Sequence, residues 1–126
     1  MEKKFATAIN CMDGRVQEPV IKWLKQKFAI DYVDTITEAG PNKLLAQALD
    51  SSKVNSIKKR VEISVKKHGS KIIAIIGHFD CAGNPVDKKT QIKQIKEGIK
   101  LIKTWGFKVD VIGAWVDSDW KLQEID

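Results

Sequence analysis

Cysteine, histidine and arginine are scarce in this sequence: its 126 residues contain two of each, beside twenty lysines. Two cysteines in a chain of this length do not suggest a disulfide-stabilised scaffold, so we expect a reducing, cytoplasmic compartment in which both thiols are free. No run approaches the ~20 apolar residues that a membrane span requires. The charged first residues are not followed by the apolar stretch of a signal peptide. We therefore expect no membrane partner.

The net charge of +6 comes almost entirely from lysine. A basic chain suggests nucleic-acid binding as a first hypothesis. However, the lysines are spread over several helical stretches, as in 58–59, 66–67 and 88–89, and no aromatic residues alternate with them to stack on bases. A solvated helix surface explains this pattern better, so we expect no nucleic-acid partner.

Short apolar runs alternate with amphipathic stretches along a chain whose length fits one domain, residues 1–126. The alternation predicts an α/β fold of three layers with a mainly parallel sheet. The unbroken apolar run at 71–77 is typical of a central strand that is buried on both faces. We expect strands at 5–10, 32–37, 71–77 and 107–116, and a short antiparallel return at 120–125. We expect helices at 16–28, at 43–49 as a short turn, from a cap at Ser51 or Ser52 to 68–69, and from about 87 to 106.

Three of the four cysteine and histidine side chains lie in two short segments, 11–15 (CMDGR) and 77–83 (GHFDCAG). Each segment directly follows an expected strand. Open parallel sheets bind ligands at the carboxyl ends of their strands, where the strand order reverses. If the first and third strands are neighbours there, Cys11 meets His78 and Cys81. Two thiolates and one imidazole are three of the four ligands of a tetrahedral zinc ion, and an open fourth position would make that ion catalytic.

The order of these motifs resembles the β-class carbonic anhydrases: Cys-x-Asp-x-Arg after a first strand, then Gly-His-x-x-Cys after a central strand. Residues 38–42 (EAGPN) are similar to the Asn-Ala-Gly segment after the second strand of that family, and residues 111–117 (VIGAWVD) are similar to its late strand and turn. The resemblance covers most of the chain. It implies a sheet in the order two-one-three-four with an antiparallel fifth strand, and a homodimer or a higher homo-oligomer.

The resemblance also implies an activity, the reversible hydration of carbon dioxide to bicarbonate with zinc-bound hydroxide as the nucleophile. Cys11, His78 and Cys81 would bind Zn²⁺. Asp13 and Arg15 would be the carboxylate–guanidinium pair beside the metal, in which Asp13 accepts a hydrogen bond from the hydroxide and Arg15 keeps it ionised. If Arg15 releases it, Asp13 could become the fourth zinc ligand and close the site.

Several alternatives remain at this point. The two cysteines could be ordinary buried residues, and Asp13–Arg15 a structural ion pair. The same zinc chemistry could hydrolyse carbon disulfide or carbonyl sulfide, or zinc could stabilise a non-catalytic binding module. Gly14 replaces the serine or threonine that is usual in the family. We expect His68 at a surface helix end, Asp80 in a turn or as an acceptor outside the ligand set, and the four tryptophans in packing.

Overall fold

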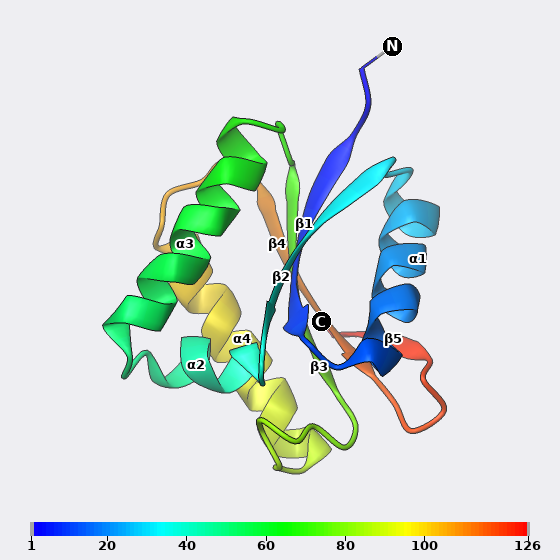
Figure 1. The fold of residues 1–126 in the computed structure, drawn as a ribbon, viewed down its shortest axis with the longest axis vertical. Coiled ribbons are helices and arrows are strands. Elements are labelled where there is room, and N and C mark those ends of the chain that lie inside the picture. The colour runs from blue at the N-terminus through cyan, green and yellow to red at the C-terminus, as the bar shows by residue number, and fades with distance from the viewer. Residues whose placement is uncertain (1, 126) are drawn as a thin grey trace.

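The computed structural model describes residues 2–125, and Figure 1 shows a sheet between two layers of helices. The strands are β1 (Phe5–Cys11), β2 (Tyr32–Glu38), β3 (Ile72–His78), β4 (Asp110–Val116) and β5 (Leu122–Ile125). The helices are α1 (Gln17–Phe28), α2 (Pro41–Gln47), α3 (Ser51–Lys66) and α4 (Lys88–Lys103), and a 3₁₀ turn, η1 (Gly14–Val16), precedes α1.

The sheet has the order β2-β1-β3-β4-β5. The first three neighbouring pairs are parallel, and β5 pairs antiparallel with β4. This confirms the predicted α/β fold class with its order two-one-three-four and its antiparallel fifth strand. Because β1 and β3 are parallel neighbours, the ends of both strands lie at one edge of the sheet, where Cys11 and His78 are their last residues.

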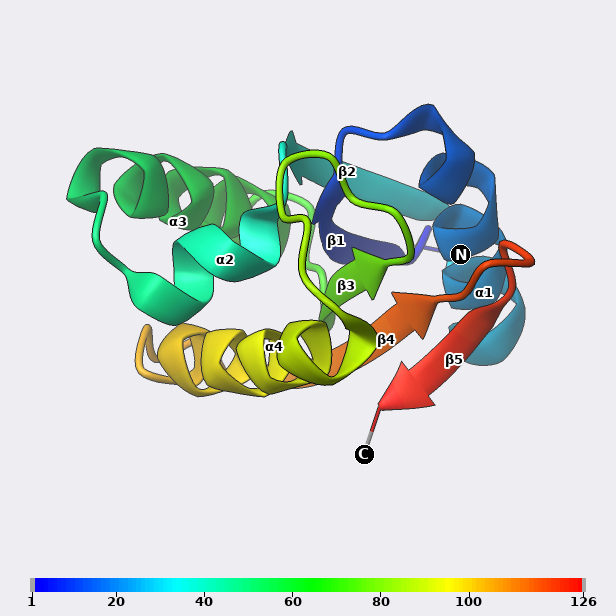
Figure 2. The same ribbon diagram turned by 90° about the horizontal axis from the view of Figure 1, so that it is seen from below.

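The two faces of the sheet bury different side chains. Helix α1 covers one face, and α2, α3 and α4 cover the other (Figures 1 and 2). Strand β3 contributes to both cores: Ala74 and Ile76 belong to the cluster that contains α1 residues, while Ile73 and Ile75 belong to the cluster that contains α3 and α4 residues. All four side chains are almost completely buried, as expected for a central parallel strand.

Several element boundaries differ from the sequence-based prediction. Helix α3 is capped by Asp50, whose carboxylate accepts a hydrogen bond from Lys53 N, and Ser51 is already helical. Helix α2 begins at Pro41, because Gly40 adopts a left-handed conformation and proline suits the first helical position. Strand β4 begins only at Asp110, and β5 only at Leu122, after a turn.

Membrane crossing is excluded for the described helices: none within residues 2–125 is long and apolar enough to span a bilayer.

Candidate metal centre

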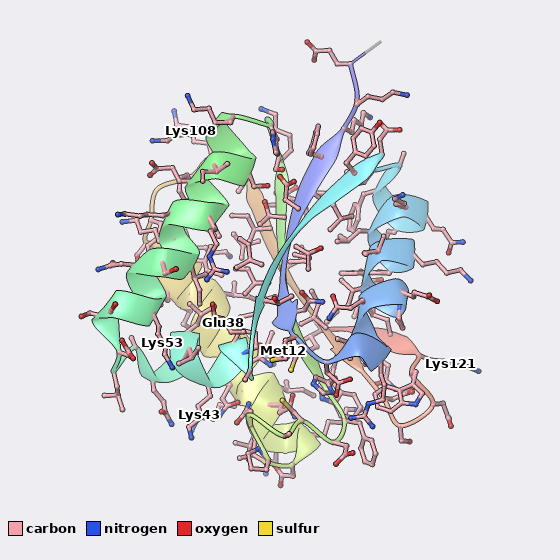
Figure 3. All side chains as sticks on the ribbon, viewed as in Figure 1. Met12, Glu38, Lys43, Lys53, Lys108 and Lys121 are labelled. Carbon is pink, nitrogen blue, oxygen red and sulfur yellow. The ribbon has the colours of Figure 1, made fainter. Side chains whose placement is uncertain are left out.

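The structure brings Cys11, His78 and Cys81 together at the carboxyl edge of the sheet. All three residues are buried, and the candidate ligand atoms, one from each, lie within 4.8 Å of one another. The two Sγ atoms are 3.8 Å apart although their residues are 70 positions apart in sequence. Next to Cys11, Met12 lies beside Glu38, whose carbonyl oxygen accepts a hydrogen bond from Met12 N at 2.9 Å (Figure 3).

The donor set fits a tetrahedral zinc ion. With zinc–sulfur bonds of about 2.3 Å at the tetrahedral angle, two sulfur ligands lie roughly 3.8 Å apart, which is the separation found here. A hydrogen bond also fixes the orientation of the His78 imidazole, because its Nδ1 lies 2.7 Å from the carbonyl oxygen of Phe79. Donation by Nδ1–H leaves the lone pair on Nε2, and Nε2 is buried without a hydrogen-bond partner in the described part of the chain. A cation would satisfy this nitrogen.

The two thiols differ in acidity. Burial raises the pKa of Cys11, but the nearby imidazole of His78 and the backbone at Asp13 and Gly40 outweigh this effect and lower the pKa to about 7. Burial raises the pKa of Cys81, and the neighbouring Cys11 raises it further, to about 11. One thiolate therefore forms readily, whereas the second needs a compensating cation.

Two buried or half-buried glutamines hold the backbone of the ligand-bearing segments. Gln17 Nε2 donates to the carbonyl oxygens of Cys11 and Asp13, both at 2.8 Å. Gln91 lies against His78: its Oε1 accepts from His78 N at 2.9 Å, and its Nε2 donates to His78 O at 2.7 Å. Neither glutamine is among the sequence-based candidates. The available signal was their place in the first turn of the helix that follows each segment.

Close backbone packing fixes the surrounding loops. Gly40 has a φ of +72°, and a Cβ at this position would lie 2.7 Å from Asn84 Cβ and 2.9 Å from Gly83 C. Only glycine combines this conformation with this approach. The 38–42 segment thus packs directly against the loop that carries Cys81. At Gly77, a Cβ would lie only 2.5 Å from the side chain of Gln91.

Asp13 and Arg15 form a two-pronged ion pair beside the cluster. Arg15 Nη2 is 2.7 Å from Asp13 Oδ2, and Arg15 Nε is 3.1 Å from Oδ1. Asp13 Oδ1 also accepts the backbone N–H of Arg15 at 2.9 Å, which caps η1. The hydrogen bonds with Arg15 lower the pKa of Asp13 to about 2, and the same contacts raise the pKa of Arg15. Asp13 is therefore an anion with a fixed orientation at neutral pH.

The remaining sequence-based candidates lie outside the three-residue cluster. His68 follows α3 at the surface, where it hydrogen-bonds Asp34 at 2.6 Å and stacks on Phe5. Asp80 is a turn residue with a φ of +58°, and it contacts Arg15 rather than the cluster. The tryptophans pack against the two cores as predicted, namely Trp23, Trp105, Trp115 and Trp120.

Comparison with solved structures assigns the fold to a known class. β-Carbonic anhydrase isoform I of Trichomonas vaginalis matches with a TM-score of 0.65 and 15% identity, over 98% of this chain and 84% of the other. The β-carbonic anhydrase CafA of Aspergillus fumigatus matches with a TM-score of 0.61 and 16% identity, over 100% and 76%. A structure from a study of two tetrameric β-carbonic anhydrases of Sordaria macrospora matches with a TM-score of 0.59 and 15% identity, over 99% of this chain and 82% of the other. The chain thus has the β-carbonic anhydrase fold.

Sequence comparison narrows this class to a family. The chain belongs to the family described as "Putative carbonic anhydrase", whose model matches residues 1–126. None of the curated proteins matches the sequence. The family assignment confirms the resemblance that the two motifs suggested.

Proposed function

We propose that residues 1–126 form a single zinc domain that catalyses CO₂ + H₂O ⇌ HCO₃⁻ + H⁺. The buried Cys11–His78–Cys81 cluster carries the proposal, because its sulfur separation and its unpartnered Nε2 both fit a tetrahedral metal. Family membership supports the reaction. A zinc ion held there would act as a Lewis acid and make a water in its fourth position far more acidic than bulk water.

The chain's own residues have separate roles in this proposal. Cys11, His78 and Cys81 hold the metal, and the Nδ1–H bond to Phe79 O keeps the histidine in the tautomer that offers Nε2. Asp13 accepts a hydrogen bond from the attacking water. This bond aims a lone pair of the water oxygen at the carbon of carbon dioxide. Arg15 keeps Asp13 ionised, so this carboxylate accepts a hydrogen bond and does not donate one.

The same arrangement supports a closed state. Asp13 is two residues from Cys11, and its pairing with Arg15 and the cap of η1 hold its carboxylate in place. Release by Arg15 would free Asp13 to become the fourth zinc ligand and to displace water. The open state is the one in which Asp13 and Arg15 are paired, as they are in this structure.

A homodimer or higher homo-oligomer is the proposed assembly. Two large apolar side chains next to ligand residues face solvent: Met12 is 66% exposed, and Phe79 is 47% exposed. Exposed apolar side chains that gather into one contiguous patch mark protein–protein interaction sites. A second copy seated there would exclude water from the rim of the site. The Sordaria macrospora proteins with this fold are tetrameric.

The two histidines allow a matched test of the metal. Elemental analysis of the purified protein should give about one zinc per chain. His78→Ala should abolish it, whereas His68→Ala should retain it, because His68 lies outside the cluster. A zinc-free wild-type protein, or equal zinc in both variants, would refute the metal site.

Stopped-flow hydration with a pH indicator then tests the reaction. We expect the zinc-loaded protein to accelerate hydration between neutral and alkaline pH and His78→Ala to be inactive. A zinc-loaded protein without hydration activity would contradict the proposed reaction. Release of hydrogen sulfide from carbon disulfide or carbonyl sulfide would then support the hydrolase alternative, and its absence would support the non-catalytic binding module.

A further inference from the structure

Arg15 connects three segments that are distant in sequence. Besides pairing with Asp13, its Nη2 donates to the carbonyl oxygen of Asp80 at 3.2 Å, and its Nη1 lies 3.4 Å from an Asp80 carboxylate oxygen. Its guanidinium carbon also lies 4.4 Å from the ring centroid of Trp120, within the range of a cation–π contact. The guanidinium thus joins the loop after β1, the loop after β3 and the turn between β4 and β5.

The β4–β5 turn is constructed to hold Trp120 in this position. Asp117 Oδ1 accepts the backbone N–H groups of Asp119 at 2.9 Å and of Lys121 at 3.0 Å, and Asp117 Oδ2 accepts from Gln123 Nε2 at 3.1 Å. The backbone closes the same turn, because Trp120 N donates to Asp117 O at 2.9 Å. The network fixes the residue that carries the indole.

The two residues that contact Arg15 from the other loops, Asp80 and Trp120, have unusual backbone conformations. Trp120 has a φ of +60°, and Asp80 has a φ of +58°. A left-handed conformation is uncommon outside glycine and is a genuine outlier for a bulky residue. Such conformations persist where the surrounding structure enforces them, and they cluster at functional sites. Here the two outliers meet at one guanidinium.

We infer that Trp120 is a positioning residue: by covering one face of Arg15, its indole holds the guanidinium in the orientation that pairs with Asp13. The β4–β5 turn then controls how readily Asp13 is released and hence how readily the site closes. The catalytic consequence rests on the proposed function. The contact itself does not, because it involves only groups of this chain.

Hydrogen exchange of the Arg15 Nε–H, followed by NMR of the purified protein, tests the contact directly. Exchange of a protected proton follows the fraction of time for which its contacts are open. Removing a cation–π contact at a partly exposed site should raise this fraction about two- to fivefold. We therefore expect about two- to fivefold faster exchange in Trp120→Leu, and a smaller increase in Trp120→Phe, which retains an aromatic face.

Trp105→Leu is the matched control, because Trp105 is also half-buried but packs against the other core cluster. It should leave Arg15 exchange unchanged, and the backbone amides of β3 serve as an internal reference for global stability. Equal Arg15 exchange in wild type and Trp120→Leu would overturn the inference, and so would equal acceleration by Trp105→Leu.

The hydration assay separates this inference from the proposed function. If the wild type hydrates carbon dioxide, Trp120→Leu should lower kcat, with unchanged KM and zinc content, by at most the two- to fivefold by which the unpaired fraction of Arg15 rises. Faster exchange without any change in kcat would overturn the step from Arg15 to the site. An inactive wild type would refute the proposed function, while the exchange result would still decide whether Trp120 positions Arg15.

Discussion

Gln91→Leu should destabilise both the fold and the metal centre. Gln91 is 2% exposed and makes hydrogen bonds with both backbone groups of His78. The pairing of β3 with β1 ends at Ile75. The side-chain amide of Gln91 therefore supplies hydrogen-bond partners for the backbone of His78, which lies beyond the end of that pairing. Leucine has a similar size but offers neither partner. The variant therefore leaves one N–H and one C=O buried and unpaired.

The expected loss follows from these two groups. Each unpaired buried group costs about 1–3 kcal/mol, and the added apolar burial of leucine offsets roughly 1 kcal/mol. We expect the free energy of unfolding to fall by about 1–5 kcal/mol, which lowers the melting temperature by roughly 4–20 °C in a domain of this size. Zinc affinity should fall about tenfold, because the backbone of His78 orients the ligand.

Denaturant unfolding followed by circular dichroism measures the stability term, with Gln94→Leu as the control. Gln94 lies on the same helix, is half-buried, and accepts a single hydrogen bond, from Asn84 Nδ2 at 2.6 Å. Its loss leaves one buried group unpaired, the amide of Asn84, where Gln91→Leu leaves two, so the control should lose clearly less stability, about 0–2 kcal/mol after the gain from leucine burial. A Gln91→Leu protein within about 0.5 kcal/mol of wild type, or a control that loses as much, would refute the reasoning.

Three further changes test other contacts. Chelation should lower the melting temperature of the wild type but not that of Cys81→Ser, whose site lacks one thiolate; equal shifts in a thermal scan would argue against a metal that stabilises the fold. The pKa of Asp13 is lowered from 3.8 to about 2, so its contribution to stability is complete above about pH 4 and is lost as the pH falls towards 2. In the zinc-free Cys81→Ser background, acid unfolding curves should thus lose less stability over this window when Asp13→Asn is added, and parallel curves would contradict the pairing. Gly14→Ser should be tolerated in stability and hydration assays, because a Cβ there meets nothing within 4 Å, and a destabilised variant would show that the space is not free.

The sequence predicts the architecture and the meeting of the three candidate ligands because both depend on strong, local patterns. The apolar run that ends in β3 indicates a buried central strand, and right-handed crossovers bring parallel strand ends to one edge. Two chemically distinctive segments that follow such strands then lie close together if the strands are neighbours, and the resemblance to the β-class carbonic anhydrases implies that order. Neither step requires knowledge of any side-chain contact, which is why Cys11 and His78 could be paired across 67 positions of sequence.

The contacts that hold the site could not be predicted in this way. A glutamine in the first turn of a helix, such as Gln17 or Gln91, has the same local pattern as a solvated residue. Its partner is the backbone of the preceding strand end, and this becomes visible only when the helix is placed against the sheet. The cap of α3 shows the same limit on a smaller scale. Asp50, Ser51 and Ser52 are all good capping residues, and the structure selects Asp50.

The two glutamines hold the candidate metal centre in place by contacts that need no metal. Each strand–loop–helix unit is fixed by a side chain from the first turn of its own helix, which reaches back to the residue that carries a ligand. The ligand-bearing backbone is therefore anchored by hydrogen bonds that do not involve the metal. Metal removal should lower the stability but leave the β1 and β3 ends in register, so the far-UV circular dichroism of the chelated protein should match that of the holoprotein below its melting temperature. A site that the metal itself organises would instead lose helical signal on chelation, since α1 and α4 begin at these loops.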